Sequence, residues 1–450
     1  MKRVFTILIS LFILQGARGQ QRAPVALSLK QCIDYALENN PNIKSSKIAI
    51  DASQAKVNET VSIGLPQITG SADLGNNFII PTSFLPAEIL GGPPGEYVGV
   101  KFGTQYVGRA TINVDQMIFN GSYFVGLKAS RTYTDLTRKE LISSQTDLVT
   151  AIKKAYYGVL VSTERLALVE KNYQRLDSLL SQTKVMFNNG FAEKIDVNRV
   201  QVQYNNIITA NKSAKIGLTV GYNILKFQMG LPMSEDIVLT DNLETIKVQV
   251  LNEDFTNNFT YSNRIEYSKL EVNQALTQLD IKNTNVQYLP RLDFYGSYGA
   301  SYGTASFDNF ISFGAKWRDL GTFGIRASLP IFDGFRKSNQ IQQKKIQLQQ
   351  IENSKVLVKN QIDMEQMQAG LTFNNSIETL RLQRANMDLA EEVYNVTVIK
   401  YQQGVGSNIE VINADASFKE AQTNYYAALY DALIASVDLE KSYGKILTIQ

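Results

Sequence analysis

Two long stretches without proline constrain the fold of this 450-residue chain more than any other feature. The chain has ten prolines, with none between Pro94 and Pro232 and none after Pro330. Because proline breaks the interior of a helix, these stretches can form helices of unusual length. Apolar residues at spacings of three and four predict one helix over 122–188 and another over 339–402. Helices of about 100 Å need partners along their length, as in a coiled coil.

Each long helix is followed by a turn that contains glycine and then by a shorter helix. The first turn contains Gly190, and the second contains Gly404 and Gly406. The shorter helices are predicted over 195–229 and 409–443. Glycine adopts the positive φ that a tight helical turn needs, so each half of the chain is predicted to contain a helical hairpin with a tight tip.

Alternating apolar and polar residues precede each proline-free stretch and predict a pair of strands in each half. Each run has about the length of a strand that crosses a bilayer at a tilt, roughly 9–11 residues. The segments between the paired strands, 75–108 and 303–321, are rich in glycine and aromatic residues and are predicted to be loops. The alternating runs cover 67–74, 109–114, 292–298 and 322–329.

Four short motifs occur twice, in the same order, with separations of 213 to 224 residues. This collinear order predicts a duplication, with repeats at 20–248 and 249–450. In each repeat a strand pair (67–119 and 291–332) precedes a helical hairpin (122–230 and 335–447). The matched motifs are Gly64-Leu65-Pro66-Gln67 with Tyr288-Leu289-Pro290-Arg291, Ile118-Phe119-Asn120-Gly121 with Ile331-Phe332-Asp333-Gly334, Phe187-Asn188-Asn189-Gly190 with Tyr401-Gln402-Gln403-Gly404, and Ile195-Asp196-Val197 with Ile409-Glu410-Val411.

The junctions of the predicted repeat have a physical basis. Pro66 and Pro290 are each expected to end a helix and to start a strand. Gly121 and Gly334 are expected to lie where the returning strand turns into the long helix. These four residues therefore mark the predicted strand–helix junctions.

The first 19 residues have the pattern of a secretory signal peptide. Lys2 and Arg3 precede an apolar run over 4–14, and small residues lead to a cleavage site after Gly19. The run is too short to span a bilayer as a helix. No later apolar stretch is long enough for a transmembrane helix, so any crossing of a membrane must use closed strands.

The remaining composition excludes several kinds of function. With the three basic residues of the signal removed, the 45 Lys+Arg become 42, equal to the 42 Asp+Glu, which argues against a nucleic-acid-binding protein. The chain has no histidine and one cysteine, which excludes an internal disulfide, His/Cys zinc sites and histidine-based triads. Cys32 is interpreted as a buried small hydrophobic residue. A phosphate-binding loop motif is absent, and we predict no cofactor and no enzymatic activity.

The ordered set of motifs resembles the TolC-type outer-membrane factor family. The set includes the signal peptide, an early helix over 28–40 that ends in Asn-Asn-Pro, the Leu-Pro strand entries and the doubled helical hairpin. The resemblance implies a mainly α fold with membrane β structure. Three copies would combine four strands each into a twelve-stranded β-barrel, continued by a periplasmic coiled-coil tunnel. Assembly is also expected because four strands cannot close a pore and lipid does not tolerate open edges.

The same resemblance implies a gate at the periplasmic end of the tunnel. Asp196 matches an aspartate that pairs with a tyrosine, and the tyrosine matches Tyr401. Glu410 matches the first of two inward-facing acidic residues, whereas the second position is Asn413. Gly406 stands where better-known members have an arginine, so the latch and the ion selectivity are expected to differ in detail. An alternative is that Asp196 and Glu410 only stabilise the first turns of their helices.

The function implied by the resemblance is that of a passive exit duct in a tripartite efflux system. The duct would lie in the outer membrane of a diderm bacterium, with a large periplasmic portion. Its partners would be two further copies of the chain, outer-membrane lipid, an inner-membrane transporter and a periplasmic adaptor that contacts the tips near Gly190, Gly404 and Gly406. A type I protein-secretion duct and a periplasmic coiled-coil structural protein are alternatives. Drugs, metals and proteins all remain open as cargo.

Overall fold

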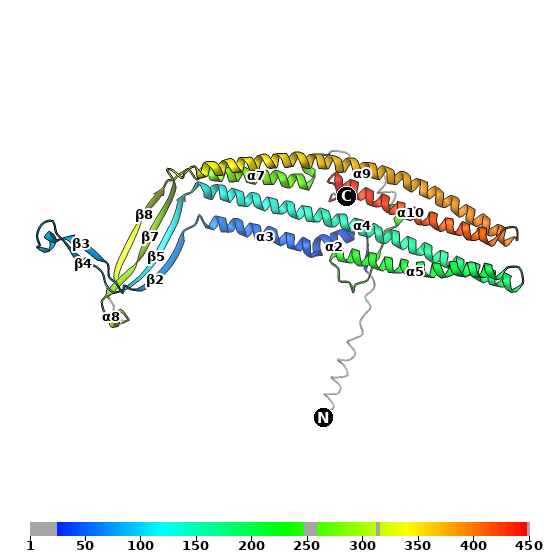
Figure 1. The fold of residues 1–450 in the computed structure, drawn as a ribbon, viewed down its shortest axis with the longest axis horizontal. Coiled ribbons are helices and arrows are strands. Elements are labelled where there is room, and N and C mark those ends of the chain that lie inside the picture. Colours follow the sequence, from blue (N-terminus) through cyan, green and yellow to red (C-terminus); the bar gives the residue numbers. More distant parts are fainter. Residues whose placement is uncertain (1–24, 247–258, 312–315, 448–450) are drawn as a thin grey trace, which may run out of the picture. The chain divides into compact units, whose positions relative to one another are not determined.

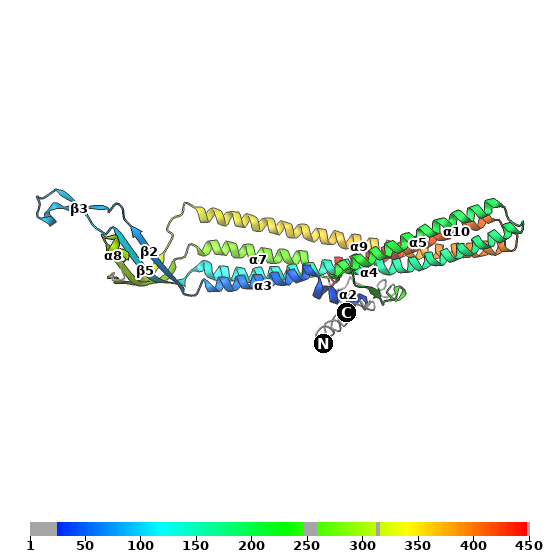
Figure 2. The same ribbon diagram turned by 90° about the horizontal axis from the view of Figure 1, so that it is seen from below.

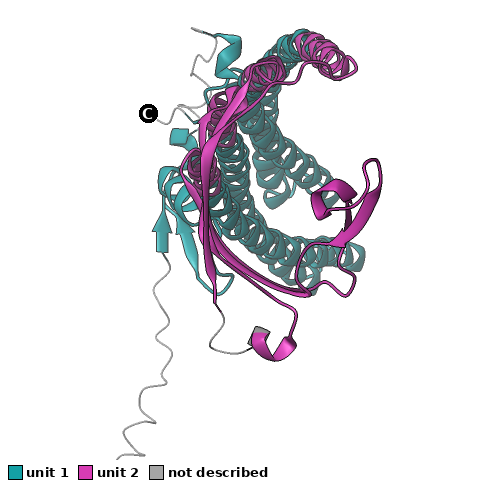
Figure 3. Ribbon diagram, turned by 90° about the vertical axis from the view of Figure 1, so that its left-hand side faces the viewer, with its two compact units in different colours: residues 1–49, 138–269, 355–450 teal, residues 50–137, 270–354 magenta. Residues whose placement is uncertain are grey.

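The computed structural model describes residues 25–246, 259–311 and 316–447. The predicted signal peptide and the predicted boundary between the repeats lie outside these residues. The chain forms two compact units (Figure 3): unit 1 contains described residues up to 49, 138–269 and 355–447, and unit 2 contains 50–137 and 270–354. Within the described ranges, no helix is both long and apolar enough to cross a membrane.

Two helical hairpins form most of unit 1 (Figure 1). The first consists of α4 (Gly121–Asn188) and α5 (Lys194–Met229), and the second of α9 (Arg336–Gln402) and α10 (Asn408–Ser442). The amino-terminal parts of α4 and α9 belong to unit 2. Both tips lie at the same end of unit 1 in Figures 1 and 2. The four helices predicted from the proline-free stretches are confirmed.

Smaller elements complete unit 1. Helix α2 (Leu29–Asn39) is capped by Ser28, whose hydroxyl accepts a hydrogen bond from the backbone of Gln31. Strands β1 (Val25–Leu27) and β6 (Ile237–Leu239) form a parallel pair. The short helix η2 (Tyr261–Asn263) precedes helix α7 (Ile265–Val286), which starts in unit 1 and continues into unit 2.

The core of unit 1 has two apolar clusters. One lies where α2 meets the middle of α4, the end of α5 and the end of α10, and Cys32 is fully buried in it, as predicted. Tyr156 is also fully buried there, and its hydroxyl donates to Asp241 Oδ2 at 2.8 Å. The second cluster lies nearer the tips and joins α4, α5, α9 and α10. Packing against neighbouring helices, rather than helix propensity, therefore stabilises the hairpins.

Unit 2 contains a four-stranded antiparallel sheet in the order β2-β5-β7-β8. The central pairing joins the two repeats, with Thr111 of β5 opposite Gly299 of β7. Strands β2 and β8 are the edges of this sheet. All four strands were predicted, and they are longer than the alternating runs: β2 (Gln67–Asn76), β5 (Tyr106–Phe119), β7 (Arg291–Thr304) and β8 (Arg318–Ser328).

The predicted loops contain further structure, so that expectation was incomplete. Segment 75–108 includes an antiparallel pair of strands, β3 (Thr82–Pro86) and β4 (Tyr97–Lys101), joined by the short helix η1 (Ala87–Leu90). Segment 303–321 includes the short helix α8 (Phe307–Ile311). Strands of five residues between prolines and glycines show too few alternations to be recognised from the sequence.

The junction residues lie between helices and strands. Helix α3 (Pro41–Ser62) ends before Pro66 and β2 follows it, and α7 ends before Pro290 and β7 follows it. Gly121 is the first residue of α4, where an added Cβ would lie 2.9 Å from Val286 Cβ. Gly334 instead has a positive φ of 64° and open space around it. The two matched glycines therefore meet different needs: close packing in one repeat and a turn in the other.

Candidate functional site

The tips of the two helical hairpins contain most of the residues that the sequence singled out. Gly190 and Gly404 have φ values of 80° and 75°, which confirms the predicted left-handed turns. The most exposed large apolar side chain is Phe191 at the first tip and Val405 at the second, and each is 78% exposed. Sequence reasoning missed these two residues, although an apolar residue directly after a turn glycine was the available signal.

Asp196 is engaged at the start of its own helix. Its Oδ2 accepts a hydrogen bond from the backbone N–H of Glu193 at 3.2 Å, and its Oδ1 lies 3.5 Å from Arg199 Nη1. The Asp196 side chain is 21% exposed. These contacts are those of a capping residue, as the alternative interpretation of this aspartate predicted.

Tyr401 lies at the end of the second hairpin's long helix and packs against the apolar cluster near the tips. Burial raises the pKa of the Tyr401 phenol, a hydrogen bond with Thr183 opposes this rise, and the charge of Asp196 adds to it. The structure thus brings Tyr401 and Asp196, from different hairpins, within electrostatic range of each other. The phenol stays protonated at neutral pH and remains a hydrogen-bond donor.

Glu410 and Asn413 lie on the exposed face of α10, one turn apart. The next residues toward the core, Val411 and Ala414, are buried. The backbone N–H of Glu410 donates to Ser407 Oγ at 3.4 Å, which caps the helix. Both predicted gate residues are therefore available to solvent in the single chain.

Gly406 has little room for a side chain. An added Cβ would lie 3.0 Å from the backbone nitrogen of Tyr401 and 3.1 Å from the carbonyl carbon of Lys400. The backbone N–H of Gly406 donates to the Lys400 carbonyl oxygen at 3.1 Å. The turn is therefore built around a glycine, and an arginine at this position would require the backbone to shift.

A buried ionic cluster lies between the hairpins, and sequence reasoning missed it. Arg175 Nη2 of α4 lies 3.2 Å from Oδ1 of Asp415 on α10, and Lys419 pairs with the other carboxylate oxygen at 2.5 Å. Asp415 is 3% exposed. Arg175 also donates to Asn172 Oδ1 at 2.8 Å, and Asn172 donates to Gln422 Oε1 at 3.0 Å. The signal available was a charged residue inside an apolar stripe on each helix.

Aromatic rings complete the surroundings of Arg175. Its guanidinium carbon lies 4.3 Å from the centre of the Tyr394 ring on α9 and 5.2 Å from that of Phe418 on α10. The two rings stack, with their centres 5.9 Å apart. One arginine of the first hairpin therefore contacts both helices of the second.

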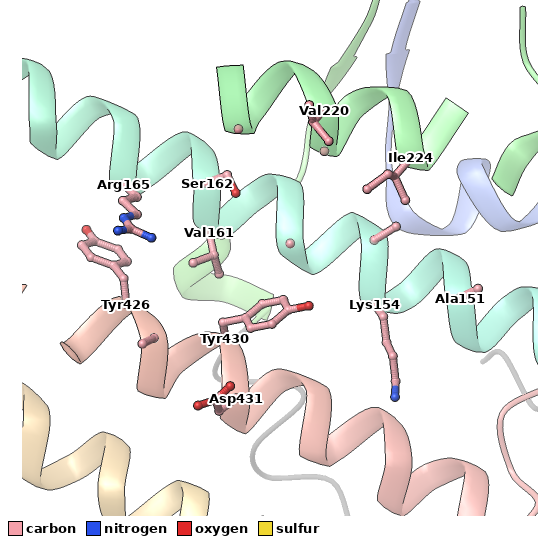
Figure 4. Close-up of a pocket in the computed structure, with 15 residues that line it drawn as sticks. Ala151, Lys154, Val161, Ser162, Arg165, Val220, Ile224, Tyr426, Tyr430 and Asp431 are labelled. Carbon is pink, nitrogen blue, oxygen red and sulfur yellow. The ribbon is translucent and has the colours of Figure 1, made fainter. Parts of the chain in front are cut away.

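A groove of about 580 Å³ runs between α4, α5 and α10 (Figure 4). Glycines at 158, 217 and 221 line it together with apolar side chains such as Val220 and Ile224, and Lys154 and Asp431 lie among its lining. The described residues include no group of three or more His, Cys, Asp or Glu residues that could hold a metal ion. This lining suits packing against another apolar surface rather than acid–base chemistry.

Comparisons with known proteins agree with this architecture. The family model described as "Outer membrane efflux protein" matches residues 32–210 and 262–445. Outer membrane protein TolC of Vibrio cholerae is 22% identical, over 98% of this chain and 95% of TolC. Alkaline protease secretion protein AprF of Pseudomonas aeruginosa is 20% identical, over 97% of this chain and 87% of AprF.

A solved structure shows the same fold. A crystal structure of CusC, from a study of the conformational changes that accompany its folding and transmembrane channel formation, superposes on this chain with a TM-score of 0.72. The match covers 95% of this chain and 95% of CusC, at 14% sequence identity. The likeness extends over both units of the chain, so the strands and the helical hairpins belong to one known architecture.

Proposed function

We propose that this chain is a subunit of an outer-membrane channel, and the proposal starts from its family. The chain belongs to the outer membrane efflux protein family, whose model matches most of its residues. It is an outer-membrane protein with the fold of the TolC-like channels. Our proposal is that three copies form a channel in the outer membrane and that its helices continue into the periplasm. The channel is the passive exit duct of a tripartite efflux system.

The open edges of the main sheet are the observation that carries this proposal. Among the residues that the structure describes, strands β2 and β8 each have a strand partner on one side only. Lipid offers no hydrogen bonds to an unpaired strand edge, so a sheet of this kind in a membrane must be closed by further copies. Pairing β8 of one copy with β2 of the next removes both edges. Three copies then give a barrel of twelve strands.

The helical tips are the proposed contact with a periplasmic adaptor. Phe191 and Val405 would supply the apolar contact, and Gly190, Gly404 and Gly406 hold the turns that present them. We propose that Asp196, Tyr401, Glu410 and Asn413 lie around the closed end of the tunnel. The energy for transport would come from an inner-membrane transporter, and the chain itself would catalyse no reaction and bind no cofactor.

Deletion of the gene followed by complementation tests the proposal. We expect the wild-type chain to run as a heat-modifiable trimer in outer-membrane fractions and to restore dye export. The variant Phe191→Asp with Val405→Asp should keep the trimer and lose export, because charges replace both apolar tip residues. The matched control is Val202→Asp, which places a charge at an exposed apolar position of α5 about two turns from the tip. A monomeric chain in the periplasmic fraction would overturn the proposal.

Protein secretion is a second candidate because AprF is among the relatives and is named for secretion of an alkaline protease. The duct and its assembly would be the same, and only the cargo would differ. Measuring a secreted protease and a dye with the same complemented strain separates the two functions. Loss of protease secretion without loss of dye export would favour the secretion duct.

A further inference from the structure

The β3–β4 hairpin exposes an unusual amount of apolar surface. Phe84 of β3 is 72% exposed and Tyr97 of β4 is 68% exposed. Segment 77–102 contains only three charged residues, Glu88, Glu96 and Lys101. A concentration of exposed apolar residues on one short hairpin indicates a site of interaction. The other exposed large apolar residues of the segment are Phe78, Ile79, Ile89, Leu90, Val98 and Phe102.

The hairpin is a folded element rather than an irregular loop. Phe84 lies opposite Gly99, where an added Cβ would come within 3.5 Å of the Phe84 ring. At the tip, Glu88 Oε1 accepts a hydrogen bond from the backbone N–H of Gly95 at 3.0 Å, and Ala87 is buried. At the base, the Asn77 side chain donates to the carbonyl oxygen of Thr104 at 3.0 Å. The backbone that carries the apolar side chains is therefore ordered before any partner binds.

The hairpin lies on the concave side of the main sheet, and both belong to unit 2 (Figure 3). It connects β2 to β5 at the end of the sheet away from α3 and α4. The equivalent connection in the second repeat, between β7 and β8, contains only the short helix α8 among its described residues. Strands β7 and β8 pair in the sheet without such a hairpin between them. The β3–β4 hairpin of the first repeat is therefore not needed to form the sheet.

We propose that the β3–β4 hairpins of three copies pack against one another and cap the outer mouth of the channel. The inference rests on the proposed function, because closing the sheet into a barrel turns its concave side inward and places three hairpins around one axis. We expect the hairpin of a second copy, rather than lipid, to cover this apolar surface, because the inward side of the barrel faces away from lipid. The barrel also holds the three copies close together. Pro86 at the end of β3 and Lys101 at the end of β4 disfavour pairing of strand edges, so contact through side chains is expected.

Reversible cross-linking tests the cap. We expect the variants Tyr97→Cys and Ile89→Cys to form disulfide-linked dimers when outer membranes are treated with a mild oxidant. The control is Asp308→Cys, which is exposed on α8 and outside the hairpin, and it should remain uncross-linked. The native cysteine does not interfere, since Cys32 is fully buried. Intact trimers without cross-links at either position would overturn the proposal, as would cross-links to a different protein.

Export measured before and after reduction tests the closure of the mouth. Oxidised Tyr97→Cys should lose most of its dye export, and a thiol reductant should restore it. Cross-linking without loss of export would show that the hairpins do not close the mouth. Dye export by the wild-type chain and by the reduced variant tests the proposed function itself, because both must export dye if the chain is a duct. A failure of the cap can therefore be distinguished from a failure of the proposed function.

Discussion

Arg175 on α4 and Asp415 on α10 form an ion pair across the two helical hairpins, with Nη2 and Oδ1 3.2 Å apart. Their positions in the sequence are 240 residues apart. The side chain of Asp415 is 5% exposed and that of Arg175 is 28% exposed. Removing one partner of such a pair leaves the other charge poorly solvated, which is more costly than the loss of a surface pair. The pair is therefore a largely buried polar connection between the hairpins.

We predict that Asp415→Ala destabilises the chain by about 3 kcal/mol, because Arg175 and Lys419 lose the carboxylate that they share. The temperature at which the heat-modifiable trimer dissociates would measure this loss. The control is Glu378→Gln, which breaks the exposed pair with Arg381 and should cost much less, because water screens that pair. Equal effects of the two variants would mean that burial does not strengthen the Arg175–Asp415 pair.

Replacing glycine by alanine should lower the stability of the chain at the two hairpin turns and raise it inside a long helix. Gly190→Ala and Gly404→Ala should each destabilise the chain by about 1 kcal/mol, because both residues have a positive φ. Gly370 lies inside α9, has no positive φ and has open space where a Cβ would lie. Gly370→Ala should therefore stabilise the chain by up to about 1 kcal/mol. Thermal dissociation of the three variants compares them directly, and stabilisation by either tip variant would contradict the turn assignment.

The long helices could be predicted from the sequence because their signals are local. The absence of proline, the apolar spacing and the turn glycines placed all four helices to within three residues at each end. The main strands were recognised for the same reason, through alternation over eight or so residues. Local patterns of this kind do not depend on which segments pair in space.

The contacts between distant segments could not be predicted in the same way. The Arg175–Asp415 pair joins residues on separate hairpins, and no local pattern shows which charged residues meet. The β3–β4 hairpin was missed because its strands are short and are surrounded by glycine and proline. Asp196 was singled out correctly as a residue of the tip, but its capping contact with Glu193 depends on the geometry of the turn.

Opening of the proposed gate can be measured as conductance. We predict that Asp196→Ala combined with Tyr401→Phe raises the conductance of the trimer in a planar bilayer, because it removes both the charge and the phenol hydroxyl that lie near each other. Asp196→Ala also removes the capping oxygen of α5. The control Asp196→Asn with Tyr401→Phe keeps a capping acceptor and removes the charge. Unchanged conductance in both double variants would rule out the latch.

Acid should weaken the contact between Arg264 and Glu365 within unit 1. Burial favours the protonated form of Glu365, but the hydrogen bond from Arg264 Nη2 at 2.7 Å outweighs it and lowers the pKa of Glu365 below its ordinary value of 4.5. A carboxylate with a lowered pKa in the folded state stabilises the fold above its ordinary pKa. This contribution is lost as the pH falls through the pKa of Glu365 in the folded state.

We predict that the wild-type chain loses stability below pH 4.5 more steeply than Glu365→Gln, measured as the trimer dissociation temperature across that range. Parallel curves for the two proteins would contradict this assignment.

Cys32 should be chemically inert in the folded chain. Its side chain is fully buried, and burial followed by the charge of Asp241 raises the pKa of the thiol to about 12. Because the thiolate is the reactive form, a maleimide at pH 8 should leave the folded wild-type chain unlabelled and should label it after denaturation. Asp308→Cys provides the positive control, since that position is exposed on α8, outside the β3–β4 hairpin, and should react in the folded protein. Rapid labelling of the folded wild-type chain would show that the contact of α2 with α4 and α5 opens in solution, because α2 carries Cys32 into that core.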